Sequence, residues 1–297
     1  MKKYWGYDSL PKRGWMLTLK HHEKDFLFEA MLCLYDSGGG KAFDIFKIPE
    51  AREFLFYWII LRHSNIIMVF DGKIPVENGR LLTTKEKRRN KRFFYEYLQT
   101  WKNQIEAGKG PYFSIVKPAI HQKLKDWREY ASKTNMSSEA LKQKEIYIYA
   151  CFFDIYYNVK LYFDALPKPY LVRNINGYDV VFNIYSYVHI YSRHYIPNMN
   201  QDIGLSTNPE LPGVEIEEMP DSILNLIERY SENNPITPQT EYCLFTNNSE
   251  KFILWMKYKT LNETKGDGFE VRSFYKCSQE TDLKKFELDE RQLCLLM

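Results

Sequence analysis

Cysteine is scarce in this chain. Only five of the 297 residues are cysteine, they lie far apart, and no two of them have the C-x-x-C spacing. An odd and scattered set argues against a disulfide framework, and the missing C-x-x-C pairs argue against a structural zinc site. We therefore expect free thiols, and we expect neither a metal nor another cofactor.

Long hydrophobic runs are also absent. The most apolar stretch, Phe54–Leu61, ends at Arg62 and is far shorter than the roughly 20 residues that cross a bilayer. The N-terminal sequence MKKYWGYDSLPKRGW lacks the apolar segment of a signal peptide. Internal repeats and low-complexity stretches are missing too, which argues against a repeat protein. These absences predict a cytoplasmic protein with no membrane partner.

Length and charge suggest two parts. A chain of 297 residues with 44% hydrophobic residues can build two cores. Residues 166–297 carry 13 Lys and Arg against 19 Asp and Glu, a net charge of −6, which leaves +9 for residues 1–165 because the whole chain is +3. The Leu166-Pro-Lys-Pro169 segment marks the boundary. We expect a basic, mainly helical domain over 1–165 and an α+β domain over 166–297. The basic half either binds a polyanion or attracts the acidic half.

Apolar spacing and end signals predict helices in the first part of the chain. Thr84 caps one of them, and Gly108 with Gly110 ends it. A run of bulky apolar residues before an Asp-Gly turn predicts one strand. The expected helices are Glu23–Tyr35, Pro49–Arg62, Lys85–Ile105 and a long helix from Ser138 to just before Leu166, and the expected strand is Ile66–Phe70.

The second part reads as a hairpin, a helical stretch and a meander of strands. Asn176-Gly177 is typical of a type I′ turn, and Asp221 is expected to cap a short helix that ends at Tyr230. Such an order predicts the α+β class with an antiparallel sheet. The expected elements are strands Tyr170–Ile175 and Tyr178–Asn183, a helical or irregular segment Tyr185–Met199, and strands Tyr242–Thr246, Lys251–Lys259 and Phe269–Cys277.

Two histidines and an arginine gather directly after the hairpin. In a helix, His189 and Arg193 are four residues apart and share one face, with His194 next to them. Imidazole transfers protons near neutral pH, and guanidinium binds phosphate while staying charged. This combination suits cleavage of RNA without a metal. A histidine among tyrosines is about as often a surface or hydrogen-bonded core residue, so both interpretations stay open.

The segment His189-Ile-Tyr-Ser-Arg193-His194, followed by Asn208-Pro209, a short helix and a closing meander, resembles the phage-associated ribonuclease toxins of the barnase, EndoU, colicin D and RelE superfold. The likeness covers about residues 170–280. It implies that His189 or His194 is the general base or acid and that Arg193 binds phosphate. It further implies that polar strand residues orient the phosphate: Thr246, Ser273 and Tyr275, the last of which shares a face with Ser273 by the two-residue period of a strand.

This resemblance implies a metal-independent endoribonuclease of toxin or phage-defence type. RNA, with tRNA favoured, is then the substrate, and an inhibitor or antitoxin protein is a possible partner. Two other classes stay open, namely a non-catalytic RNA- or protein-binding factor and an interaction protein whose halves pack together without a ligand.

The densest positive charge in the chain lies on the helix expected after Thr84. Six cations fall within eight residues and lead into Phe93-Phe94-Tyr95. They form either a phosphate-binding patch with neighbouring aromatic rings or a solvated helix face backed by an apolar one. The candidate nucleic-acid-binding residues are Lys85, Lys87, Arg88, Arg89, Lys91 and Arg92.

Overall fold

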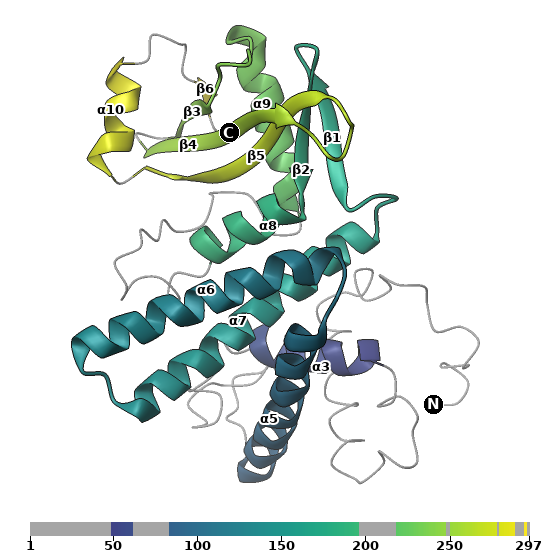
Figure 1. The fold of residues 1–297 in the computed structure, drawn as a ribbon, viewed down its shortest axis with the longest axis vertical. Helices are drawn as coiled ribbons and strands as arrows, with labels where there is room; N and C mark the ends of the chain where they lie inside the picture. Colours follow the sequence, from purple (N-terminus) through teal and green to yellow (C-terminus); the bar gives the residue numbers. More distant parts are fainter. Residues whose placement is uncertain are drawn as a thin grey trace. The chain divides into compact units, whose positions relative to one another are not determined.

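A computed structural model describes residues 49–61, 83–195, 218–247, 250–277, 279–288 and 294–295, and Figure 1 shows how their helices and strands run. The helix and strand predicted within residues 1–48 and 66–70, and the Asn208-Pro209 turn, lie outside these residues. The described part is α+β, with a helical N-terminal half and a sheet in the C-terminal half. The predicted fold class is confirmed.

The chain divides into two compact units. Unit 1 comprises residues 1–113 and 120–157, and unit 2 comprises residues 114–119 and 158–297. The division falls within helix α7 (Ser138–Asp164), whereas the Leu166–Pro169 segment follows that helix. The predicted domain boundary after residue 165 stays a prediction. Each unit is described by itself below.

Unit 1 is helical where it is described. It contains α3 (Pro49–Leu61), α5 (Thr84–Ala107), most of α6 (Pro111–Thr134) and the first part of α7. The predictions of α3, α5 and α7 are confirmed, except that Thr84 is the first residue of α5 and therefore does not cap it. We did not predict α6 from the sequence, because Pro118 lies inside it and proline usually breaks a helix.

The start and end of α6 have simple causes. Gly110 adopts a φ of 106°, and Pro111 then occupies the first turn, where its missing N–H costs nothing. At the other end, Asn135 takes the left-handed conformation with a φ of 54°, and its N–H donates to the carbonyl oxygen of Ala131. Asparagine tolerates this conformation better than most residues, so it ends the helix.

Aromatic rings form the core of unit 1. Phe56 of α3 contacts Tyr97 of α5 and Phe153 of α7, with centroids 4.9 and 4.7 Å apart. Trp101 packs edge-on against Phe153 at 5.1 Å and donates its indole N–H to the carbonyl oxygen of Tyr149 at 2.9 Å. These rings are buried, so they belong to the core of unit 1.

Unit 2 is built on one mixed sheet with strand order β1-β2-β5-β4-β3-β6. The predicted hairpin is confirmed, since β1 pairs antiparallel with β2 across Asn176 and Gly177, whose φ values are 49° and 84°. The predicted meander β3-β4-β5 is antiparallel as well. The hairpin joins the meander through a parallel pairing of β2 with β5, so the sheet is not antiparallel throughout. The strand bounds are β1 Tyr170–Ile175, β2 Tyr178–Asn183, β3 Tyr242–Asn247, β4 Glu250–Thr260, β5 Asp267–Lys276 and β6 Cys294–Leu295.

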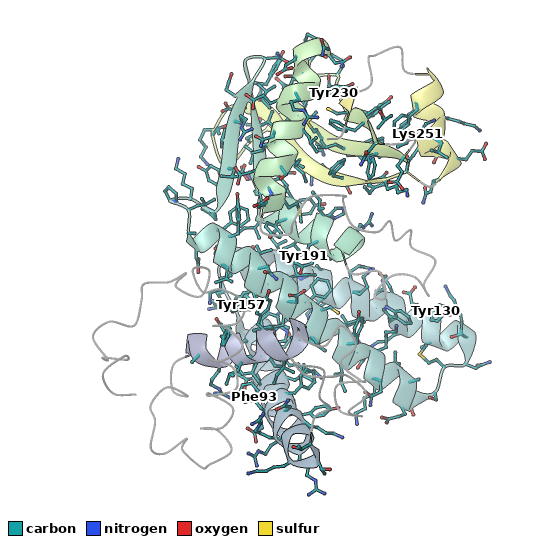
Figure 2. The ribbon with its side chains drawn as sticks, turned by 180° about the vertical axis from the view of Figure 1, so that it is seen from behind. Phe93, Tyr130, Tyr157, Tyr191, Tyr230 and Lys251 are labelled. Carbon is teal, nitrogen blue, oxygen red and sulfur yellow. The ribbon has the colours of Figure 1, made fainter. Side chains whose placement is uncertain are left out.

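The two faces of the β3-β4-β5 meander carry different helices. On one face, the ring of Tyr230 of α9 (Met219–Asn233) packs on the ring of Phe245, with centroids 5.7 Å apart; Figure 2 labels Tyr230 on this helix. On the other face, α10 (Glu280–Leu288) packs Leu283 and Phe286 against a cluster that includes Leu244 and Ile253. Leu244 and Phe245 are neighbours in β3, so their side chains point to opposite faces.

One prediction about α9 is wrong. Asp221 does not cap the helix, because α9 begins at Met219 and Glu218 holds the N-cap position. Pro220 occupies the first turn, which lets the helix start earlier. Asp221 instead accepts a hydrogen bond of 2.7 Å from the hydroxyl of Tyr162 on α7.

Candidate functional site

The predicted His-Arg segment forms the short helix α8 (Ile184–Ile190) followed by the π-helical turn η4 (Tyr191–Tyr195). Asn183 and Ser186 make a capping box: the Ser186 N–H donates to Asn183 Oδ1 at 3.1 Å, and the Asn183 N–H donates to Ser186 Oγ at 3.4 Å. This box starts the helix directly at the end of β2. Apolar residues of α8, Tyr187 among them, are buried, while Tyr185 and His189 lie one turn apart on the remaining face.

The imidazole of His189 has a strongly lowered pKa. Its imidazole stacks on the ring of Tyr185, with centroids 5.5 Å apart and planes at 22°. Burial, followed by the positive charges of Arg193 and Arg272, lowers the pKa of His189 from 6.5 to about 4. The imidazole is therefore neutral at pH 7. Among the described residues, its ring nitrogens have no hydrogen-bond partner.

Arg272 lies at a bulge in β5 and places its guanidinium over Tyr185, the ring on which His189 stacks. Trp255 pairs with Ser273 and Met256 pairs with Val271, which leaves Arg272 without an opposite residue on β4. A bulged residue turns its side chain away from the regular alternation. The guanidinium carbon of Arg272 lies 4.9 Å from the centre of the Tyr185 ring. Tyr185, His189, Arg193 and Arg272 are called the His189 cluster below.

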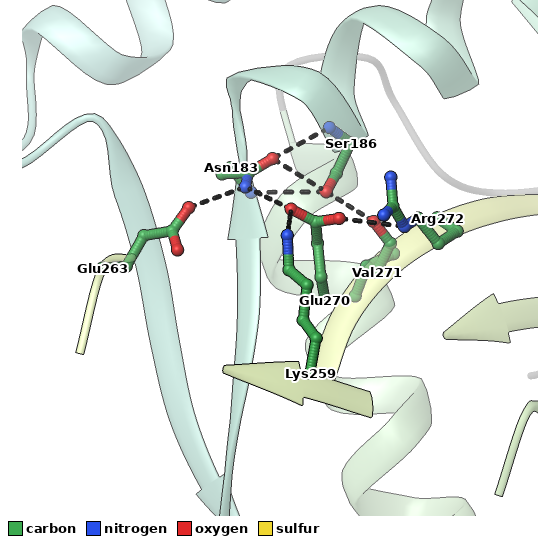
Figure 3. A network of polar contacts seen from close by, with 7 residues as sticks. All are labelled: Asn183, Ser186, Lys259, Glu263, Glu270, Val271 and Arg272. Carbon is green, nitrogen blue, oxygen red and sulfur yellow. Dashed lines mark hydrogen bonds and ion pairs between the residues drawn. The ribbon is translucent and has the colours of Figure 1, made fainter. Parts of the chain in front are cut away.

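A buried carboxylate supports Arg272. The Nε atom of Arg272 lies 2.9 Å from Oε2 of Glu270, whose side chain is 6% exposed. The other oxygen, Oε1, accepts from Lys259 Nζ at 2.8 Å and from Asn183 Nδ2 at 3.1 Å. Asn183 Nδ2 also donates to Glu263 at 2.8 Å. Figure 3 shows these contacts converging from β2, β4, β5 and the turn between the last two.

The terminal nitrogens of Arg272 form the edge of the guanidinium that does not face Glu270. Its Nε faces Glu270, and the terminal nitrogens Nη1 and Nη2 make no hydrogen bond to any residue that the structure describes. Two parallel N–H groups of this kind match two oxygens of a phosphate or carboxylate. The His189 cluster therefore combines a neutral proton acceptor with cationic donors, which is an arrangement suited to an oxyanion.

Two other predicted catalytic residues, Ser273 and Tyr275, lie on β5 after Arg272. Ser273 follows Arg272 directly, is buried, and shares a face with Tyr275, as the strand period predicted. The Tyr275 hydroxyl accepts from the Trp255 indole N–H and donates to Asp282, and burial raises its pKa to about 12. Tyr275 is thus a structural link to α10 in this conformation.

Thr246 and His194 are the two remaining predicted catalytic residues. Thr246 pairs with Lys251, which is four residues from the partner of Ser273 on β4, or about 13 Å along the strand. His194 lies in η4 next to Arg193, and its side chain is outside the described residues. The catalytic assignments of both residues stay predictions.

The basic run lies on α5 in unit 1. Arg89 is only 7% exposed, and its Nε donates to Asn90 Oδ1 at 3.2 Å, so it points inward. The side chain of Lys87 is outside the described residues. The remaining four cations lie on the surface of the helix: Lys85, Arg88, Lys91 and Arg92.

Sequence reasoning missed four residues of the site, namely Asn183, Tyr185, Glu270 and Arg272. A glutamate between Phe269 and Val271 in a strand is a visible signal, because a buried carboxylate needs a cationic partner. Asn183 just before a helix carries the ordinary N-cap signal. The bulge at Arg272 has no comparable signal in the sequence.

Comparisons with protein-family models, with curated proteins and with solved structures found no match to this chain. Within the described residues, no group of three or more His, Cys, Asp or Glu side chains could hold a metal. Every helix in the same part of the chain is too short or too polar to cross a membrane. The ribonuclease resemblance stays a prediction.

Proposed function

We propose that this protein is a metal-independent endoribonuclease and that the His189 cluster binds and cleaves an RNA phosphodiester. One observation carries the proposal. The imidazole of His189 is uncharged at neutral pH, has no hydrogen-bond partner among the described residues, and lies in the field of two guanidinium groups. A proton acceptor beside fixed cations is what attack of a ribose hydroxyl on a phosphodiester requires.

The proposed reaction assigns one role to each group. His189 takes the proton of the ribose 2′-hydroxyl while its oxygen attacks phosphorus. Arg193 and Arg272 bind the non-bridging oxygens, whose negative charge grows in the transition state. The bond from phosphorus to the 5′-oxygen breaks, and His194 gives that oxygen a proton. The products are a 2′,3′-cyclic phosphate and a 5′-hydroxyl.

The low pKa of His189 in the protein without substrate is compatible with its role as a base. An imidazole with a pKa of about 4 is a weak base. A bound phosphodiester offsets the charge of Arg193 and Arg272, so the pKa of His189 rises toward the ordinary value. The substrate thereby strengthens the base that acts on it.

The biological part of the proposal comes from the resemblance in residues 170–280. A toxin or phage-defence nuclease acts on cytoplasmic RNA, with tRNA favoured, and is held in check by an inhibitor or antitoxin protein. Among the strand residues, Ser273 fits best as a phosphate-orienting group because it follows Arg272 directly. Thr246 and Tyr275 have less support, given their places in the sheet.

The test is cleavage of tRNA by the purified chain with a metal chelator present. We expect new ends that carry 2′,3′-cyclic phosphate, and we expect His189→Gln and Arg272→Gln each to slow cleavage by a factor of about 100 or more. The matched control is His121→Gln, because His121 is exposed and pairs with Glu106 on the helical surface of unit 1. Cleavage by His189→Gln at the wild-type rate would refute the assignment.

A second function is favoured by the surface of α5. Lys85, Arg88, Lys91 and Arg92 are exposed there, and such cations bind the phosphates of RNA without chemistry. In this alternative the chain is a non-catalytic RNA- or protein-binding factor. Replacing Arg88 and Arg92 with Gln should then weaken RNA binding and lower the slope of log affinity against log salt by about 2, whereas His189→Gln should change neither.

A further inference from the structure

His189 and Arg272 belong to different elements of unit 2. His189 is on α8, which follows β2, and Arg272 is on β5. A base and a phosphate-binding cation act together only if their separation is fixed to within a fraction of an ångström. The question is which contacts hold α8 in place against β5.

Asn183 links the two elements through opposite ends of one amide group. Its Oδ1 accepts from the N–H of Ser186 and so caps α8, the helix that carries His189. Its Nδ2 donates to Oε1 of Glu270 on β5 at 3.1 Å. Ser186 adds a second tie, since its hydroxyl donates to the carbonyl oxygen of Val271 at 2.6 Å. Figure 3 shows Asn183 between the helix start and the Glu270 carboxylate.

Glu270 continues the link to Arg272. Its Oε1 is held by Asn183 and Lys259, which fixes the carboxylate plane. Its Oε2 is buried, forms an ion pair with Arg272 Nε at 2.9 Å, and accepts no hydrogen bond from the part of the chain that the structure describes. The Glu270 carboxylate lies between Lys259 and Arg272, and these three side chains together carry a net charge of one positive unit. The carboxylate contacts the Nε side of the guanidinium, so Glu270 does not occupy the Nη edge.

We propose that Asn183 and Glu270 are positioning residues that set the distance between His189 and the Nη edge of Arg272. The catalytic consequence rests on the proposed ribonuclease function, whereas the geometric claim does not. Neither residue touches the substrate in this scheme. Asn183 places the helix, and Glu270 turns the guanidinium.

The decisive variant is Asn183→Thr. Threonine keeps an oxygen that can cap α8, but it has no amide to donate to Glu270 and Glu263. The matched control is Asn174→Thr, because Asn174 also donates its Nδ2 to a carboxylate, that of Asp179, within the exposed part of the same hairpin. Glu270→Gln is a second variant, which keeps the shape of the side chain but removes the charge that faces Arg272. Glu270→Asp retains that charge.

Two measurements separate positioning from plain structural support. On an RNA substrate, Asn183→Thr should lower kcat by about 10- to 100-fold and change KM less than about threefold, a loss of the size that misplaced supporting groups cause. Glu270→Asp should keep more activity than Glu270→Gln. When the His189 ring protons are followed by NMR as a function of pH, the midpoint of the titration should lie higher by roughly half a pH unit or more in Asn183→Thr than in wild type. The reason is that the positive charge of Arg272 is then farther from the ring.

The outcomes are distinguishable. If the wild-type chain cleaves no RNA, the proposed function fails, and the His189 titration still tests the positioning claim. If Asn183→Thr and Asn174→Thr have the same kcat and the same His189 midpoint as wild type, the positioning claim is overturned, whatever the chain cleaves. Circular dichroism of each variant confirms that the comparison is between folded proteins.

Discussion

Lowering the pH should destabilise unit 2 through one identifiable histidine. The pKa of His189 is lowered to about 4 in the folded protein, first by burial and then by the charges of Arg193 and Arg272, while an unfolded histidine has a pKa of about 6.5. The unfolded chain therefore binds a proton at a pH at which the folded chain does not. The protonation of His189 costs no stability above about pH 6.5. As the pH falls from 6.5 toward 4, the free energy of unfolding decreases, and below about pH 4 this group lowers it no further.

The size of the effect follows from these two values. A difference of roughly 2.5 units at 1.36 kcal/mol per unit gives roughly 3 kcal/mol in full. At pH 5 the loss relative to pH 7 is about 2 kcal/mol, because the folded group is still mostly neutral there. A loss of this size is a large share of the stability of a single domain.

The assay is an NMR titration of the histidine ring protons. The signal absent from His189→Gln identifies His189, and its midpoint should lie near pH 4 in the wild-type chain. Addition of sulfate, an anion that does not titrate in this range, should raise the midpoint if it binds between the two guanidinium groups. Urea unfolding at pH 7 and at pH 5 gives the free energy of unfolding of each protein. Between these two pH values it should fall by about 2 kcal/mol more in wild type than in His189→Gln.

A His189 midpoint above about pH 6 in the folded protein would refute the reasoning. It would mean that the ring is solvated and far from both guanidinium groups. The ring-proton signal of His121, which pairs with Glu106 on an exposed surface, is the control for effects of the variant on the whole chain, since its chemical shift at pH 7 should be the same in wild type and His189→Gln.

Three further predictions concern the fold and are measured by thermal or urea unfolding. Gly177→Ala should cost about 1 kcal/mol, because the φ of 84° is unfavourable for alanine although the space around it is empty. Gly268→Ala should cost clearly more than Gly177→Ala, because its new Cβ would collide with the carbonyl oxygen of Asp179 where β2 meets β5; equal costs would contradict that close approach. Phe153→Ala should cost about 3–5 kcal/mol, since the ring is fully buried among Phe56, Tyr97 and Trp101. A loss below about 1 kcal/mol would contradict this core.

Local signals were enough to predict much of the fold. Asn176-Gly177 specified a type I′ hairpin because both positions need a positive φ, and the structure has them at 49° and 84°. The apolar spacing after Ser138 predicted α7, and Thr84 predicted the start of α5. These features depend on residues that are close in the sequence, so the sequence determines them directly. The helix α6 was missed because Pro118 hides its pattern.

The candidate site divides in the same way. His189 and Arg193 were predicted because they are four residues apart in one segment, and local helix geometry places them together. The carboxylate of Glu270 and the bulge at Arg272 could not be predicted to join them. That arrangement requires the parallel pairing of β2 with β5, and strand pairing between distant segments depends on the packing of the whole sheet.

The sequence by itself determined the α+β class, the hairpin, the helices α3, α5 and α7, and the presence of an imidazole beside a guanidinium. Only the tertiary structure decided that Arg272 joins His189, that Arg89 points inward, and that Thr246 lies about 13 Å along the sheet from the residues opposite Ser273. The reason is physical. Helix and turn preferences act over a few neighbouring residues, whereas a bulge and a parallel strand pair arise from contacts between segments that meet only when the sheet has formed.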